Sequence, residues 1–225
     1  MNHVPGQIII LNGTPRSGKS SIATVIQESF AGLWMNMGVD HFMPMVPAHY
    51  QPGMGLRPGG ERPDLEASIS QLYQGMYTAI AGHSRLGLNV VVDVGHHDCY
   101  SRPMHLLSSC ARILHGLPVL FVGVRCPIEH IMQRRRDTGW DTPPIDAPIP
   151  RPVLLWQQET HIPGIYDLEV DTSLLSPQEC AALIRQHLEH GPAPTACTRL
   201  AAPVSYTHLR AHETDSYLVC RLLLE

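Results

Sequence analysis

The sequence predicts an α/β protein in which a doubly wound parallel β-sheet is flanked by helices. Several short apolar runs, such as NVVVDV and VLFVGV, lack polar alternation, as expected for strands covered on both faces. These runs alternate with stretches that have helical spacing, and that order is typical of a parallel sheet. With 225 residues the chain has room for one domain of this kind.

The predicted elements follow in order from the N-terminus. The β-branched run 7–12 predicts a strand, and 20–30 has apolar residues at helical spacing. A second strand is expected over 33–39, ending at Asp40, and a helix over 64–86 with Asp64 as its N-cap. The remaining strands are expected over 89–94, 119–124 and 166–170, and the remaining helices over 102–115, 127–137 and 176–190. Ser176, Pro177 and Glu179 form a clear helix start for the last of them.

Three segments are predicted to lack regular structure. Residues 43–63 hold five prolines and four glycines, and a long loop in a compact domain is often a lid or binding loop. Residues 141–152 are also rich in proline. From Gly191 onward the composition is that of a linker, and 204–225 resembles the conceptual translation of a sequencing-library adapter. We therefore expect one domain over 1–190 and an unstructured or artefactual tail over 191–225.

Composition limits the class of ligand. Charged residues make up only 16% and the net charge is -4, which does not indicate the basic surface of a nucleic-acid-binding protein. The sequence has no run of about 20 uncharged apolar residues and no signal-like N-terminus, so we expect a cytoplasmic protein without a membrane partner. The six cysteines include no CxxC pair. A small molecule is the expected ligand, and the oligomeric state is not indicated.

The turn after the first strand carries a phosphate-binding motif. Its residues read GTPRSGKS and fit G-x-x-x-x-G-K-[ST] between a strand and a helix, where backbone N–H groups converge on phosphate oxygens. Lys19 is the only lysine in the chain, and in this motif it bridges the β- and γ-phosphates of ATP, while the Ser20 hydroxyl ligates Mg²⁺. The predicted nucleotide-binding residues are Gly13, Thr14, Pro15, Arg16, Ser17, Gly18, Lys19 and Ser20.

Two carboxylates are expected where predicted strands end. Asp93 closes the strand 89–94 and is predicted to join Ser20 in the Mg²⁺ site. Asp40 follows the second strand, at the sheet edge where ligands bind, and is either a base for an attacking hydroxyl or a cap of the next turn. The triplet 96–98 (HHD) predicts a polar loop near the phosphates in preference to a metal site, because adjacent residues rarely reach one ion.

Arginines and apolar side chains complete the candidate site. Three consecutive arginines end the helix 127–137, and Arg134 and Arg136 are candidates for stabilising charge on the transferred phosphoryl group. A solvated helix end is the alternative, since at most two of the three can reach one phosphate. The loop 43–63 supplies apolar residues that favour a lipophilic acceptor: Met43, Met45, Val46, Tyr50, Met54 and Leu56.

Together these residues resemble the chloramphenicol phosphotransferase-like family of P-loop kinases over about residues 7–190. The resemblance rests on the segments IIILNG with GKS, GVD at 38–40, VVD at 91–93, VGVRC at 122–126, and His161 with YDLEVDT at 166–172. It implies ATP-dependent phosphorylation of a hydroxyl, with Asp40 as general base. Chloramphenicol 3-O-phosphotransferase catalyses a reaction of this kind, and the resemblance therefore also implies a role in antibiotic resistance. The sequence departs from the family at 134–141 (RRRDTGWD), where an Arg-Gly-Asp-Arg-like lid is usual.

Three alternatives remain open. The sequence does not exclude a kinase of the same mechanism with another acceptor, such as a nucleoside, a sugar acid or an aminoacyl metabolite. A P-loop ATPase or GTPase that uses water is a second alternative, although the sequence lacks an NKxD-type element and this class gives no role to Asp40. A nucleotide-binding module without catalysis is the third, and the intact set Lys19, Ser20, Asp93 and Asp40 argues against it.

Overall fold

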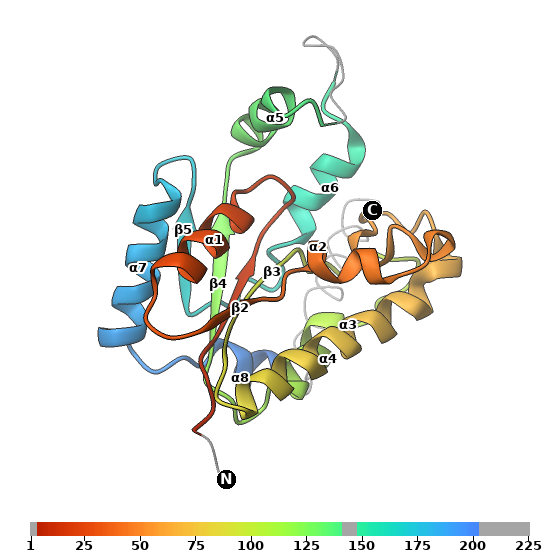
Figure 1. The fold of residues 1–225 in the computed structure, drawn as a ribbon. Helices are drawn as coiled ribbons and strands as arrows, with labels where there is room; N and C mark the ends of the chain where they lie inside the picture. The colour runs from red at the N-terminus through yellow and green to blue at the C-terminus, as the bar shows by residue number, and fades with distance from the viewer. Residues whose placement is uncertain (1–3, 141–147, 203–225) are drawn as a thin grey trace, which may run out of the picture.

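The structure is a computed structural model that describes residues 4–140 and 148–202 (Figure 1). Its centre is a five-stranded sheet of order β2-β3-β1-β4-β5 in which every neighbouring pair is parallel. The strands are β1 (Ile8–Asn12), β2 (Trp34–Asn36), β3 (Asn89–Val94), β4 (Val119–Arg125) and β5 (Leu168–Asp171). This order confirms the predicted doubly wound parallel sheet.

Helices cover both faces of the sheet (Figure 1). Ile9 and Leu11 of β1 face the core beneath α1 (Lys19–Ser29) and α7 (Pro177–His190). Ile8 and Ile10 face the opposite core, which is shared by α3 (Pro63–Arg85), α4 (Leu106–Ile113) and α8 (Ala196–Ala201). Because both faces are buried, β1 contains no polar position until Asn12.

Further elements lie beyond the carboxyl ends of the strands (Figure 1). They are α2 (Val39–Phe42), the 3₁₀ turns Met43–Met45, Ala48–Tyr50 and Gly53–Gly55, α5 (Ile128–Asp137) and α6 (Arg151–Glu159). Ile131 and Met132 of α5 share a small apolar core with Val153 of α6. These elements surround the edge of the sheet where parallel α/β proteins bind ligands. None of the helices in the described ranges is long and apolar enough to cross a membrane.

The structure corrects several predicted boundaries. Strand β2 ends at Asn36, so Asp40 lies in the first turn of α2 and not at a strand end. Helix α3 begins at Pro63, whose fixed φ suits the first helical position, and its N-cap is Arg62. Asp64 is therefore not the cap; it pairs with Arg62 at 2.7 Å. The predicted start of α7 is confirmed, because Ser176 and Glu179 form a capping box.

The prediction of an unstructured tail from Gly191 is wrong for residues 191–202. Helix α8 buries Ala196 and Leu200 in the core that β1 shares with α3 and α4. The Asp167 carboxylate accepts hydrogen bonds from the backbone N–H groups of Thr195 and Ala196, at 2.7 and 2.8 Å. We propose that the domain extends to residue 202, while the adapter-like run 204–225 lies outside the described residues.

Leu200→Ala is expected to lower the free energy of unfolding by about 2–3 kcal/mol, because it removes a buried side chain from a packed core. Thr198→Ala, an exposed position on the same helix, is the control and should change stability by less than about 0.5 kcal/mol. Urea titration of the two variants makes the comparison. Equal stabilities would support the linker interpretation of this segment.

Candidate active site

The phosphate-binding loop connects β1 to α1 at the edge described above. Gly18 forms the N-cap of α1 with φ +93°, a left-handed conformation that glycine adopts without a side-chain penalty. The loop therefore turns directly into the helix, and the first backbone N–H groups of α1 have no intrahelical acceptors. These groups and the positive end of the helix dipole form an anion site.

Lys19, the first residue of α1, is buried in this loop. Its Nζ donates a hydrogen bond to the carbonyl oxygen of Thr14 at 2.7 Å. Burial lowers the pKa of Lys19 to about 8, and the charges of Asp93 and Asp40 partly offset that effect. The ammonium group is thus desolvated, and an anionic ligand at the loop would stabilise its charge.

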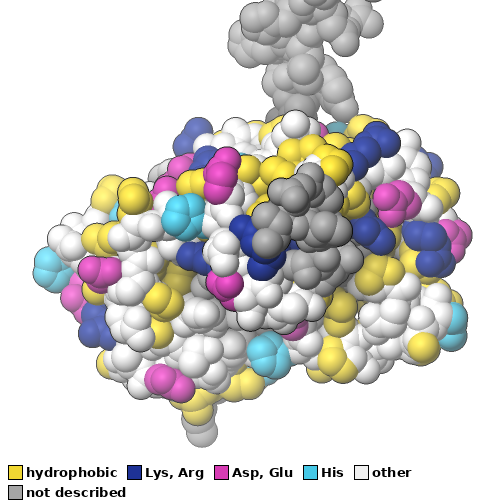
Figure 2. Space-filling model, turned by 90° about the horizontal axis from the view of Figure 1, so that it is seen from above, with side chains coloured by type: hydrophobic (Ala, Val, Ile, Leu, Met, Phe, Trp, Pro, Cys, Tyr) yellow, Lys and Arg dark blue, Asp and Glu magenta, His cyan; other side chains and the backbone are white. Residues whose placement is uncertain are grey.

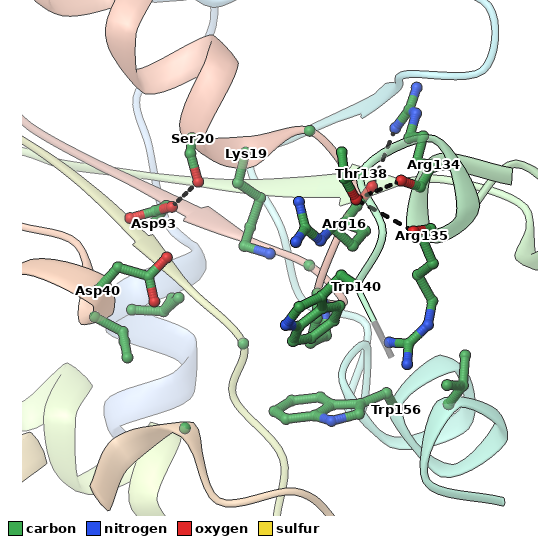
Figure 3. A pocket seen from close by; sticks show the side chains of 18 of the residues that line it. Arg16, Lys19, Ser20, Asp40, Asp93, Arg134, Arg135, Thr138, Trp140 and Trp156 are labelled. Atoms are coloured by element: carbon green, nitrogen blue, oxygen red, sulfur yellow. Dashed lines mark hydrogen bonds between the residues drawn. The ribbon is translucent and has the colours of Figure 1, made fainter. Parts of the chain in front are cut away.

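Ser20 and Asp93 form a pair of oxygen donors beside Lys19 (Figure 3). The Ser20 hydroxyl donates to Asp93 Oδ2 at 2.6 Å. Gly38 leaves the room for this carboxylate, because a Cβ on Gly38 would lie 1.5 Å from Asp93 Oδ1. A hydroxyl and a carboxylate are ligands that Mg²⁺ accepts, and Mg²⁺ commonly completes its shell with water and phosphate oxygens. The two residues therefore fit a Mg²⁺ ion that accompanies a polyphosphate.

Asp40 faces this group from α2 (Figure 3). Its side chain lines the same cavity as Lys19, Ser20 and Asp93. Within the part of the chain that the structure describes, its carboxylate makes no hydrogen bond or ion pair, so it does not cap the turn. A carboxylate in this position can accept a hydrogen bond from a hydroxyl group bound in the cavity.

The cavity has a volume of about 1040 Å³ and extends from both sides of the phosphate-binding loop. On one side it is lined by Thr172, Leu175 and Pro177, which follow β5. On the other side its lining comes from the segment after β2 and from α6: Val39, Met43, Pro52, Met54, Gly55, Arg57, Val153 and Trp156. Lys and Arg side chains and apolar side chains gather on this face of the molecule (Figure 2). The volume lies at the upper end of the range found for small-molecule and cofactor sites.

Only part of the predicted apolar wall lies in the cavity. Met43 and Met54 line it. Leu56 is buried in the core, whereas Met45 and Tyr50 are exposed by 72% and 40%. Trp156, which the sequence patterns do not indicate, also lines this side (Figure 3).

The arginines of α5 have three different environments. Arg134 donates to the hydroxyl and carbonyl oxygens of Thr172, at 3.0 and 2.6 Å, and to the carbonyl of Arg16 at 3.3 Å, which ties α5 to the phosphate-binding loop. Arg135 lines the cavity and its guanidinium lies 4.5 Å from the ring of Trp140. Arg136 is outside the cavity lining and donates to Gln133 at 2.8 Å. The structure therefore brings Arg134 and Arg135 to the site, and not Arg136.

Asn12, at the junction of β1 and the loop, is a buried residue that the motif does not include. Its Nδ2 donates to the Thr160 carbonyl at 2.9 Å and to Tyr166 Oη at 2.8 Å. Tyr166 Oη in turn lies 2.8 Å from His161 Nδ1, and burial lowers the pKa of His161 to about 4. This neutral network holds the base of the loop in place.

Comparison with known proteins identifies relatives of this chain. A family model described as chloramphenicol phosphotransferase-like protein matches residues 6–189. A Mycobacterium tuberculosis protein named "Putative O-phosphotransferase Rv2636" is 27% identical over 214 residues, which cover 87% of this chain and 88% of that protein.

Solved structures of P-loop kinases share the fold. The M. tuberculosis APS kinase CysC, in complex with AMPPNP and APS, gives a TM-score of 0.52 at 16% identity and covers 82% of this chain and 98% of its own. Shikimate kinase from Acinetobacter baumannii, in complex with shikimate, gives a TM-score of 0.53 at 12% identity. The match covers 83% of this chain and 93% of the shikimate kinase. The family model spans most of the sequence, and the phosphate-binding loop of the chain lies between β1 and α1, as predicted. The chain therefore belongs to the chloramphenicol phosphotransferase-like family.

Proposed function

We propose that the protein transfers the γ-phosphoryl group of ATP to a hydroxyl group of a small molecule. The observation that carries this proposal is the convergence of Lys19, the Ser20–Asp93 pair and Asp40 on one cavity. Lys19 and the Ser20–Asp93 pair are suited to a triphosphate and its Mg²⁺. Asp40 faces them from the side of the cavity where an acceptor has room.

The donor side of the site follows from the loop. The backbone N–H groups at the start of α1 bind the phosphates, and Lys19 neutralises charge at the β- and γ-positions. Ser20 and Asp93 would hold Mg²⁺, and the ion would neutralise part of the negative charge of the phosphates. The APS kinase that shares this fold is in complex with AMPPNP, which supports an adenine nucleotide as the donor. Arg134, whose guanidinium adjoins the loop, adds positive charge beside the transferred group.

The acceptor side lies beyond Asp40. Its carboxylate orients the attacking hydroxyl and takes its proton as the new O–P bond forms and the bond to the leaving ADP breaks. The surrounding wall of Met43, Met54 and Trp156 favours an acceptor with an apolar body. Chloramphenicol is the first acceptor to test, because the family is named for it, and its phosphorylation would give antibiotic resistance. We propose a cytoplasmic site of action.

A P-loop ATPase that uses water is the rival function. It needs no acceptor cavity, and in an ATPase the Asp40 carboxylate would orient water in place of an alcohol. ADP release, measured with and without a panel of alcohols that includes chloramphenicol, separates the two functions. The proposal expects at least one alcohol to accelerate ADP release and to gain one phosphoryl group by mass. ADP release that no alcohol changes would favour the ATPase.

The affinity for nucleotide is expected to fall as the pH rises above about 8. The pKa of Lys19 is about 8 in the free protein, and a bound triphosphate raises it by stabilising the ammonium form. Below pH 8 the charge is already present, so affinity changes little. Above pH 8, Lys19 must take up a proton when the nucleotide binds, and the affinity for nucleotide falls by up to about tenfold per pH unit.

Calorimetric titration with AMPPNP, in buffers of different ionisation heat, measures this proton directly. We expect an uptake of about half a proton at pH 8 in the wild-type protein, because half of Lys19 is then neutral. Lys19→Ala is the control, since it has no group that titrates there. Identical proton uptake in both proteins would assign the effect to another group.

A further inference from the structure

Two buried histidines follow β3 directly and have no part in the phosphate site. The backbone N–H of His96 donates to Asn12 Oδ1 at 2.9 Å, so this segment is attached to the residue that precedes the phosphate-binding loop. The His96 ring lies 2.7 Å from Tyr77 Oη and packs on Tyr73, within the core beneath the acceptor side. The segment is therefore fixed at its start, and the position of His97 is fixed with it.

The His97 side chain reaches the segment that lines the acceptor side. Its Nε2 lies 3.0 Å from the carbonyl oxygen of Leu56. A carbonyl oxygen only accepts hydrogen bonds, so Nε2 carries the hydrogen and donates it. On either side of Leu56, Gly55 and Arg57 line the cavity. Two residues before Leu56, the Met54 carbonyl accepts a hydrogen bond from Tyr73 Oη at 3.3 Å. Two buried donors thus determine the course of residues 54–57.

His97 also contacts the opposite wall of the acceptor side. The ring of Trp156, on α6, stands edge-on to the His97 ring with centroids 4.9 Å apart. Trp156 rests on the backbone before His97 as well, because its Cζ3 atom would lie 3.1 Å from a Cβ placed on Gly95. Burial lowers the pKa of His97, so the ring is neutral and keeps one donor. One side chain therefore connects residues 54–57 with α6.

We propose that His97 is a positioning residue that sets the shape of the acceptor side and thereby determines which alcohols bind. It acts through the Leu56 carbonyl and the Trp156 ring, and touches neither the acceptor nor the reacting atoms. This inference rests on the proposed function, since it assigns the acceptor to this side of the cavity. Its consequence is a separation of effects: loss of His97 should weaken acceptor binding and leave the nucleotide site unchanged.

Two variants of His97 separate its hydrogen bond from its ring contacts. His97→Phe keeps a ring beside Trp156 and removes the donor to Leu56, whereas His97→Gln keeps a donor near the position of Nε2. With an alcohol that the wild-type protein phosphorylates, chloramphenicol first, we expect His97→Phe to raise the acceptor KM by ~10-fold. His97→Gln should raise it by about threefold or less. The KM for ATP and kcat should stay within about twofold in both variants.

A second measurement does not depend on finding an acceptor. In a Trp34→Phe, Trp140→Phe background Trp156 is the one remaining tryptophan, and acrylamide quenching reports its accessibility. Quenching should increase in His97→Phe and increase less in His97→Gln. Ser84→Ala is the matched control: Ser84 Oγ makes a buried bond to the Gly6 carbonyl at 2.6 Å, away from the cavity, so its loss should change stability without changing Trp156.

The kinetic and quenching results test the positioning role of His97 separately from the proposed function. If no alcohol is phosphorylated, the proposed function fails, and unchanged quenching in His97→Phe would overturn the positioning role as well. If transfer occurs, a raised acceptor KM together with increased quenching supports the role. Equal changes in the KM for ATP and for the acceptor, or an acceptor KM within twofold of wild type, would overturn it.

Discussion

Lys19→Ala is expected to lower phosphoryl transfer by ~10²-fold or more, because it removes a positioned cation at the transferring group. The sequence contains no other lysine, and Lys19 Nζ lies inside the phosphate-binding loop, 2.7 Å from the Thr14 carbonyl. Loss of the side chain leaves the backbone N–H groups of the loop in place, so some nucleotide binding should persist. The measurement is turnover with a saturating acceptor.

The fold of this variant should survive. The ammonium group is buried and its pKa is lowered, so its removal also removes a desolvation cost and should not lower the melting temperature. Arg199→Ala, which removes an exposed cation on α8, is the matched control and should retain wild-type turnover. A Lys19→Ala protein with half the wild-type rate or more would show that the loop does not act in catalysis.

Asp40→Asn is expected to lower transfer to the alcohol by ~10²-fold or more while ATP affinity stays within a few-fold. The amide keeps the size of the side chain in the first turn of α2 and removes the proton acceptor. The fall would be smaller if Asp40 mainly positions the hydroxyl, because a loose transition state needs little early deprotonation. Turnover and nucleotide binding are measured side by side.

The pattern of the two losses assigns the role of Asp40. A loss of turnover alone places it at the acceptor. Equal losses of turnover and of ATP affinity would place it in the nucleotide site, with Lys19 and Asp93. No loss in either would contradict the proposed mechanism.

The central strands and the phosphate-binding loop are predictable from sequence because their signals are local. Strands β3 and β4 are mostly apolar and lack polar alternation, and the loop is defined by residues adjacent in the chain. The capping box of α7 is equally local, since Ser176 and Glu179 are three residues apart. The Ser20–Asp93 contact follows from the same reasoning, because parallel strands bring their carboxyl ends to one edge.

Other parts of the site depend on packing that the pattern does not contain. Helix α6 begins within a proline-rich stretch that resembles a loop, yet Pro152 occupies a position that suits a helix start. Trp156 was missed with it. The choice between Arg135 and Arg136 depends on the rotation of α5 about its axis, which its contact with α6 determines. Helix α8 is short, and its burial against α4 and its hydrogen bonds to Asp167 distinguish it from a linker.

The central claim is that the γ-phosphoryl group of ATP passes to an alcohol in this cavity. Its most direct test uses ATP labelled with heavy oxygen at the γ-phosphate, incubated with the wild-type protein, Mg²⁺ and the alcohol panel, followed by mass spectrometry of every product. The account predicts that the labelled phosphoryl group appears on an alcohol, and that Asp40→Asn loses this product while it still binds ATP. Label found in inorganic phosphate alone, with no phosphorylated alcohol, would contradict it.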